Sequence, residues 1–258
     1  AASAKLGADT AYEIAQMKIG RRLAIKLLNA SKFVLNLGAT EANVVTSDTS
    51  VITNALDSAL LKQLAEVVNA STAAFERYDY AKALQLTESF FWSFTDDYVE
   101  LIKDRAYGAA GEAEQASVLA TLATTLDALL RLFAPFLPFA TEEVWGWWRH
   151  GSVHRAPWPN VDALSSAVAT ADAGILATVA TALGGIRKAK SEAKVKQRTE
   201  VLKATVTASE AQVAQLTAGL ADLKAAGNVR ELTLATGDGE LAVSGVELAP
   251  VEPVPSAE

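Results

Sequence analysis

The chain has 258 residues, 50% of them apolar and 21% charged, so it can bury a sizeable core in one large domain or two smaller ones. Its formal net charge of −7 argues against non-specific nucleic-acid binding by the whole surface, and we expect no DNA partner. Cysteine is absent, which excludes disulfides and thiolate zinc sites and fits a cytoplasmic protein; without a signal segment or a long apolar run, we expect no membrane span.

Apolar residues recur at helical spacing through the first part of the chain, which predicts a succession of amphipathic helices. A segment rich in Ser, Thr and Asn, residues 43–54, is typical of a loop. Glycines at 108 and 111 separate later helices, and prolines at 135 and 138 require a break and a restart. The expected helices cover residues 12–37, 57–77, 80–105 and 118–133, with one more after Pro138.

The remainder of the chain has a different pattern. A further helix is expected at residues 168–193, and the alternation in EVLKATVT is typical of a half-buried strand. Ser209 is a good N-cap for a helix that ends at Gly227. The segments VRELTLA and LAVSGVEL flank TGDGE, which predicts a β-hairpin.

Together these patterns predict a mainly α fold, with a helix bundle followed by a small α/β subdomain of order β-α-β-β. We assign residues 1–160 to the bundle and residues 168–250 to the subdomain. The proline-rich residues 251–258 are expected to form a disordered tail.

No arrangement typical of an enzyme site is recognisable. His150 and His154 lack the cysteines or converging carboxylates of a zinc site, so we interpret them as surface or structural histidines. Adjacent carboxylates such as Glu142 and Glu143 point about 100° apart on a helix, which favours surface charges over an acid–base pair. The sequence has neither a P-loop nor a dinucleotide glycine pattern. We therefore predict no catalytic residue and no metal site.

One segment, KIGRRLAIKLLNASKF at residues 18–33, carries five basic residues and no acidic one. On a helical wheel its apolar side chains fall within about 40° of one line, and the cationic and amide side chains occupy another sector. The expected core stripe consists of Tyr12, Ile19, Leu23, Leu27, Ala30, Val34 and Leu37. The candidate binding residues of the other sector are Lys18, Arg21, Arg22, Lys26, Asn29, Lys32 and Phe33.

A cationic face that holds one large aromatic side chain suits single-stranded RNA. Lysine and arginine neutralise phosphates, and an aromatic ring stacks on an unpaired base, the role expected for Phe33. Two alternatives remain open. The face can be a solvated helix surface, with Phe33 and Ile25 packed against another helix. Asn29 can make polar contacts with the RNA or be an internal hydrogen-bonding residue.

A second basic run lies between Arg187 and Lys203, where seven cations accompany two anions. It is either a solvated helix end with its linker or part of a surface that binds a polyanion. The two runs together favour a polyanion partner without identifying it. The residues of this secondary basic patch are Arg187, Lys188, Lys190, Lys194, Lys196 and Arg198.

Several of these segments resemble the C-terminal, anticodon-binding region of valyl-tRNA synthetases. GRRLAIKLLNASKFVL is similar to the family pattern R-N-F-A-N-K-L-W-N-A-S-R-F, with Lys26, Asn29 and Phe33 among the positions that match in kind. FFWSFTDDYVELIKDRAYG, LLRLFAPFLPFATEEVW and IRKAKSE resemble later family motifs. The resemblance covers about residues 10–248, and NASKF favours the valyl enzyme over its isoleucyl and leucyl relatives.

The resemblance implies a class I synthetase-type anticodon-binding helix bundle that binds the anticodon stem and loop of valine-specific tRNA. The family attaches valine to tRNA with ATP and Mg²⁺ in an upstream catalytic domain. The H-I-G-H-type and K-M-S-K-S-type motifs of that domain do not occur here, so we expect a non-catalytic fragment of a longer enzyme, with no cofactor of its own. The alternative is a helical protein-interaction module, derived from a synthetase, that no longer binds RNA.

Overall fold

The computed structural model describes residues 13–45 and 48–250, so the expectations for Tyr12 and for the tail at 251–258 lie outside the described residues. The chain divides into two compact units. Unit 1 comprises residues 1–96 and 105–173, and unit 2 comprises residues 97–104 and 174–258. The prediction of a mainly α fold with a small α/β part is confirmed.

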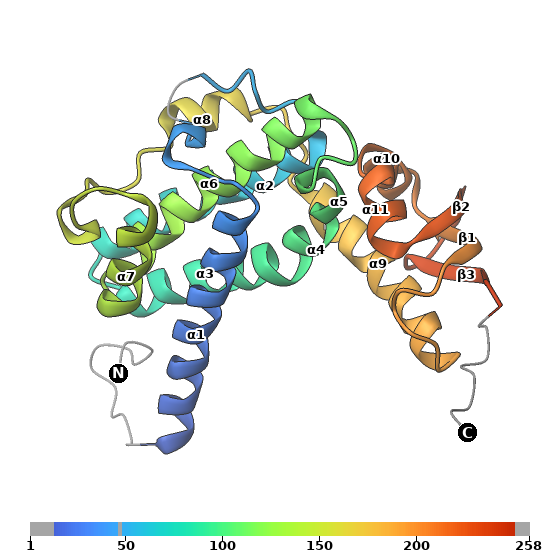
Figure 1. The fold of residues 1–258 in the computed structure, drawn as a ribbon, viewed down its shortest axis with the longest axis horizontal. Coiled ribbons are helices and arrows are strands. Elements are labelled where there is room, and N and C mark those ends of the chain that lie inside the picture. Colours follow the sequence, from blue (N-terminus) through green and yellow to red (C-terminus); the bar gives the residue numbers. More distant parts are fainter. Residues whose placement is uncertain (1–12, 46–47, 251–258) are drawn as a thin grey trace, which may run out of the picture. The chain divides into compact units, whose positions relative to one another are not determined.

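Unit 1 is a bundle of helices (Figure 1). The expected helix at 80–105 is interrupted after Ser93 by a π-helical turn, Phe94–Tyr98, and by the short helices α4, Val99–Leu101, and α5, Lys103–Ala106. The main helices of the unit are α1 (Ile14–Asn36), α2 (Ala55–Glu76), α3 (Tyr80–Ser93), α6 (Glu112–Phe133), α7 (Pro138–Trp148) and α8 (Asp162–Ala167).

Helix α6 is the core helix of unit 1, because it contacts α1, α2, α3 and α7. By length and apolar composition it is the one helix of the described ranges that could cross a membrane, but 83% of its most apolar window is buried inside the protein. A helix that is apolar on nearly all sides is expected where other helices surround it. The composition of α6 therefore follows from its central place in the bundle.

A buried ion pair joins the starts of α2 and α6 to α5. The guanidinium of Arg105 binds both carboxylate oxygens of Asp57, at 2.9 and 2.7 Å, and the two side chains are 5% and 0% exposed. Ser117 donates a hydrogen bond of 2.6 Å to the same carboxylate. Glu114 accepts bonds from Arg105 and from the side chain of Asn54, the N-cap of α2. Every partner is thus hydrogen-bonded, the condition under which a buried pair is tolerated.

A second buried carboxylate, Asp127 of α6, binds the guanidinium groups of both Arg131 and Arg149. Arg149 also binds Glu41, at 2.6 Å, and Arg131 donates to the carbonyl oxygen of Pro157, at 3.2 Å. Burial lowers the pKa of Arg131 to about 10, and the positive charge of Arg149 acts in the same direction. One carboxylate therefore holds the end of α7 and the turn at Pro157 against α6.

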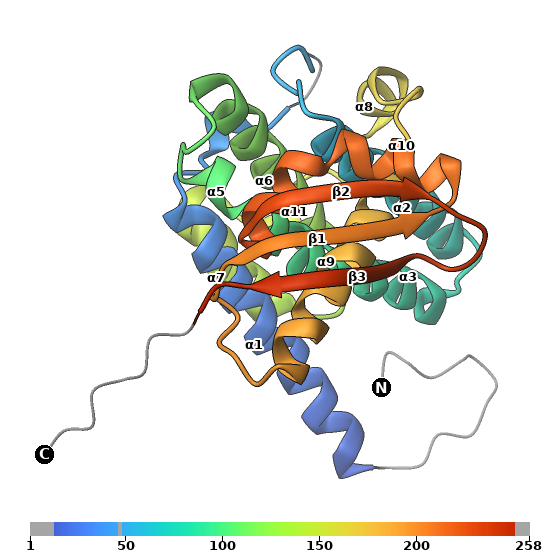
Figure 2. The same cartoon turned by 90° about the vertical axis from the view of Figure 1, so that its right-hand side faces the viewer.

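Unit 2 consists of a three-stranded sheet with helices on one face (Figure 2). The central strand, β1, pairs parallel with β2 and antiparallel with β3. Gly185 of α9 faces Val243 of β3, and a Cβ at this glycine would lie 2.5 Å from a valine methyl group. The elements are α9 (Gly174–Glu192), β1 (Val201–Ala208), α10 (Glu210–Ala218), α11 (Leu220–Gly227), β2 (Val229–Thr236) and β3 (Ala242–Leu248).

Three expectations for unit 2 need correction. The prediction of a β-hairpin is wrong, because β2 and β3 are not neighbours in the sheet. The strand β1 lies between them, so the TGDGE segment connects the two edge strands across β1. The helix expected from Ser209 to Gly227 is broken at Gly219, where a Cβ would lie 2.6 Å from Val179. The helix expected at 168–193 begins only at Gly174. The local sequence pattern identified the helices and strands of unit 2. Contacts between these elements decided which strands pair and where the helices begin and end.

The Asp57–Arg105 pair generates a stability prediction. Asp57→Asn removes the carboxylate that binds Arg105 through both of its oxygens, and breaking a buried pair of this kind typically costs about 3–5 kcal/mol of unfolding free energy. All five tryptophans lie in unit 1, so urea unfolding followed by tryptophan fluorescence reports on this unit. The control is Asp96→Asn, which breaks an exposed ion pair and should cost less than about 1 kcal/mol. Equal losses in the two variants would contradict the prediction.

Candidate nucleic-acid interface

Helix α1 is packed along its second half and exposed along its first. Leu23, Leu27 and Val34 are buried as expected, but Ile19 is 48% exposed and does not belong to the core. The physical reason is that residues 14–22 extend beyond the helices that cover the rest of α1 (Figure 1). The helical period of the sequence therefore predicted correctly which face of α1 packs against the bundle. It did not predict how much of the helix the other helices cover.

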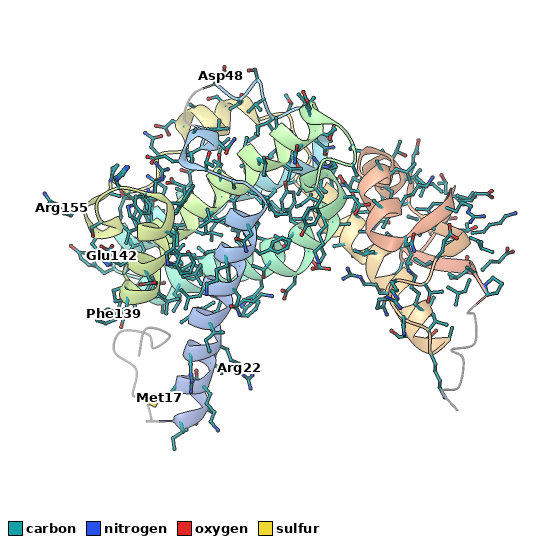
Figure 3. All side chains as sticks on the ribbon, in the orientation of Figure 1. Met17, Arg22, Asp48, Phe139, Glu142 and Arg155 are labelled. Carbon is teal, nitrogen blue, oxygen red and sulfur yellow. The ribbon has the colours of Figure 1, made fainter. Side chains whose placement is uncertain are left out.

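The first half of α1 presents three of the predicted cationic side chains to solvent. Lys18, Arg21 and Arg22 are all exposed, and none forms an ion pair with another residue of the described chain. Arg22 and Met17 lie on the part of α1 that extends beyond the bundle (Figure 3). Unpaired, solvated cations of this kind can exchange their counterions for phosphates.

Lys26 lies where α1 meets α3. Its amine is 2.8 Å from the carboxylate of Asp96 and 5.8 Å from the ring centre of Trp92. Both members of the ion pair remain partly exposed, at 37% and 54%, so solvent screens their attraction. Lys26 is therefore accessible to a phosphate, but a phosphate has to compete with Asp96.

Three predicted residues lie further along α1. Lys32 is exposed, with its amine 5.5 Å from the ring centre of Trp147 in α7. Asn29 is exposed, which disfavours the alternative of an internal hydrogen-bonding residue. Phe33 is half-buried, so part of its surface is open to a partner. Ile25 is 45% exposed, which disfavours the alternative in which it packs against another helix, whereas the half-buried Phe33 fits that alternative in part.

The secondary basic patch divides into paired, buried and exposed residues. Arg187 binds Glu100 at 2.9 Å, and Lys188 lies 3.9 Å from Glu192. Burial raises the pKa of Glu100, but the hydrogen bonds and charges of Lys103 and Arg187 outweigh this effect and the net pKa is lowered. These partly neutralised cations are weaker candidates for a polyanion than the sequence indicated.

Lys190 has to be removed from the patch, because it is only 1% exposed. Its amine donates to the carbonyl oxygens of Gln197, at 2.9 Å, and Gly227, at 2.7 Å. Burial lowers the pKa of this lysine, and the nearby charge of Arg187 acts in the same direction. A lysine in a basic run is normally solvated, so no sequence signal distinguished this one.

The remaining members, Lys194, Lys196 and Arg198, are exposed in the loop that follows α9.

The histidines give no sign of a metal site: His154 contacts the carbonyl oxygen of Pro138 at 3.1 Å, and no metal-binding group of three His, Cys, Asp or Glu occurs among the residues that the structure describes. Sequence reasoning missed the role of Asp96 and Trp92, which accompany Lys26.

The family model for the anticodon-binding domain of tRNA ligase matches residues 57–206. A valine–tRNA ligase of Thermobifida fusca is 51% identical over 253 residues, which cover 98% of this chain and 28% of that protein. A valine–tRNA ligase of Leifsonia xyli is 46% identical over 252 residues, covering 96% of this chain and 28% of that protein. The chain thus spans less than a third of the length of these relatives.

The buried amine of Lys190 generates a prediction of pH dependence. A neutral amine still has two hydrogens for its two carbonyl acceptors, so the fold retains these bonds when the proton leaves. Between the lowered pKa and the usual 10.5, the unfolded chain holds a proton that the folded chain has released. The stability of unit 2 should therefore rise with pH toward 10.5.

The measurement is urea unfolding followed by far-UV circular dichroism, with tryptophan fluorescence to identify the transition of unit 1. We expect the wild type to gain stability relative to Lys190→Met as the pH rises, since other titrating groups cancel between the two proteins. Lys188→Met, at an exposed position on the same helix, is the control and should follow the wild type. A constant difference between the wild type and Lys190→Met would contradict the assignment.

Proposed function

The chain belongs to the family of anticodon-binding domains of tRNA ligases, and from this premise we propose that it binds valine-specific tRNA through the anticodon stem and loop. The specificity for valine is supported by the resemblance to valyl-tRNA synthetases and by the names of relatives that align along nearly the whole chain. A tRNA offers both a phosphate backbone and, in its anticodon loop, unpaired bases.

The observation that carries the proposal is the exposed cationic face of α1 with a half-buried aromatic ring. Lys18, Arg21 and Arg22 are available for phosphates, and Lys26 and Lys32 extend the charge along the helix. Phe33 would offer an apolar surface on which an unpaired base can stack, and the exposed Asn29 would supply polar contacts. The cations would provide affinity for the phosphates, and the aromatic ring would provide selectivity for an unpaired base. A single-stranded loop offers both kinds of contact.

We assign the chemistry of the parent enzyme to a part of the protein outside this chain. The proposed parent attaches valine to tRNA with ATP and Mg²⁺ in the cytoplasm, and this chain contributes RNA binding without a cofactor of its own. The rival is a helical protein-interaction module that does not bind RNA. A filter-binding titration with valine-specific tRNA at several salt concentrations separates the two, because phosphate contacts make affinity fall linearly with salt on a log–log plot.

Phe33→Ala tests the stacking role. Stacking of one base is typically worth about 1–3 kcal/mol, so the variant should bind tRNA roughly 5- to 150-fold more weakly. Its salt dependence should equal that of the wild type, because no phosphate contact is lost. The melting temperature is measured on the same protein. Normal tRNA binding by a variant that melts much earlier would make Phe33 a packing residue only.

Phe139→Ala is the matched control for this experiment. Phe139 is 90% exposed on α7, so its removal also deletes an accessible aromatic ring and barely affects packing. Binding of tRNA by this variant should be unchanged. A loss equal to that of Phe33→Ala would show that any exposed ring has the same effect and would contradict a specific stacking position on α1.

Lys26 and Asp96 generate a second binding prediction with effects of opposite sign. Lys26→Gln should weaken tRNA binding and lower the log–log salt slope by about 0.7, the value for one phosphate of a single strand. Asp96→Asn removes the carboxylate that competes for Lys26 at 2.8 Å, so binding should become several-fold tighter. The measurement is the same filter-binding titration.

The double variant, Lys26→Gln with Asp96→Asn, should show the salt slope of Lys26→Gln. The control is Asp162→Asn, which removes an exposed carboxylate of the same unit from α8 and should leave binding unchanged. If Asp96→Asn and Asp162→Asn tighten binding equally, the effect is one of net charge, and Lys26 has no special contact with the RNA.

A further inference from the structure

The end of α9 has an unusual residue at its turn. The amide of Lys194 donates to the carbonyl of Ser191, at 3.0 Å, and the amide of Val195 donates to that of Lys190, at 3.1 Å. This pair of bonds is the Schellman arrangement, whose left-handed position is usually glycine. Here the position is occupied by Lys194, with φ of 54°. The chain therefore has a lysine at a position where the left-handed backbone favours glycine, the residue without a side chain.

One buried side chain, Lys190, and two exposed ones, Gln197 and Asn228, hold the segment that follows. The amine of Lys190 holds the carbonyl of Gln197, and the amide of Gln197 in turn donates to the carbonyl of Arg187, at 3.2 Å, and to the hydroxyl of Ser191, at 3.0 Å. The side chain of Asn228 donates to the carbonyl of Arg198, at 2.9 Å. Residues 194–198, here called the cationic loop, thus have a backbone anchored at several points.

The anchoring sorts the side chains of the cationic loop by direction. Val195 is half-buried, and the side-chain amide of the exposed Gln197 binds back onto α9. Lys194, Lys196 and Arg198 are exposed. In the described part of the chain, none of these three cations has a carboxylate within 4 Å, although nearby Lys203 and Arg230 are paired with Glu231 and Glu200. Three unneutralised positive charges are therefore concentrated on one preorganised loop.

We propose that the cationic loop is a second phosphate-binding site of this chain, which contacts the RNA backbone without reading its bases. The loop contains no aromatic residue for stacking, and its exposed side chains are three cations and Gln197, whose amide is bonded back onto α9. A loop whose backbone is already anchored loses less conformational entropy on binding than a mobile loop does. The proposal rests on the proposed function in one respect, namely that RNA is the partner.

Lys196→Gln with Arg198→Gln is the principal test, with tRNA filter binding over a range of salt concentrations. Loss of two phosphate contacts should lower the log–log salt slope by about 1.4 if the RNA is single-stranded there and by about 1.8 if it is a duplex. The matched control, Lys203→Gln with Arg230→Gln, removes one lysine and one arginine whose charges are already paired. Its slope should equal that of the wild type.

Lys194→Gly provides a test in which folding and binding change in opposite directions. Glycine relieves the left-handed backbone, so the thermal transition of unit 2 should stay the same or move to a higher temperature. Binding of tRNA should nevertheless weaken, and the salt slope should fall by about 0.7–0.9. A variant that folds at least as well yet binds less tightly cannot be explained by unfolding.

The outcomes distinguish the two hypotheses. If the wild-type chain binds no tRNA, the proposed function itself fails. If it binds tRNA but the loop variants keep the wild-type slope, or the control pair loses as much as the loop pair, the cationic loop is overturned as a phosphate site. If Phe33→Ala has no effect while the loop variants lower the slope, the loop is supported and the stacking site on α1 is not.

Discussion

The buried pair of Asp57 and Arg105 is the interaction on which the bundle of unit 1 depends. A guanidinium and a carboxylate out of water are tolerated only when nearly every donor and acceptor has a partner, and here Ser117, Glu114 and Asn54 supply the others. These partners belong to the starts of α2 and α6 and to α5. The need to satisfy one charge pair therefore fixes where three segments of the chain meet.

That rigid bundle explains how α1 can present an exposed cationic face. The second half of α1 is held through Leu23, Leu27 and Val34, which allows its first turns to extend without cover. Isolated helical turns are marginally stable in water, so a projecting end needs such an anchored continuation. The cost is that Ile14, Met17 and Ile19 remain exposed beside the arginines.

Unit 2 shows a conflict between stability and charge. The amine of Lys190 is buried, and Lys194 adopts a backbone conformation that favours glycine. A buried amine and a strained backbone each lower stability relative to an apolar side chain at 190 and a glycine at 194. Together, however, these two residues contribute to an anchored loop with three accessible charges. Local departures from the rules of stable folding are expected where a surface has another role.

The sequence by itself determined the helical period of α1, the β-α-β-β order of unit 2 and the anticodon-binding family, because these follow from residue spacing and from short motifs. Tertiary structure decided the rest. Whether Ile19 is covered depends on where α1 leaves the bundle, and whether β2 and β3 form a hairpin depends on which strand occupies the centre. Lys190 and Lys196 have the same chemistry and similar neighbours in the chain, but only the fold places carbonyl oxygens around one and solvent around the other. Burial is a property of contacts between distant segments, and periodicity within one segment does not contain it.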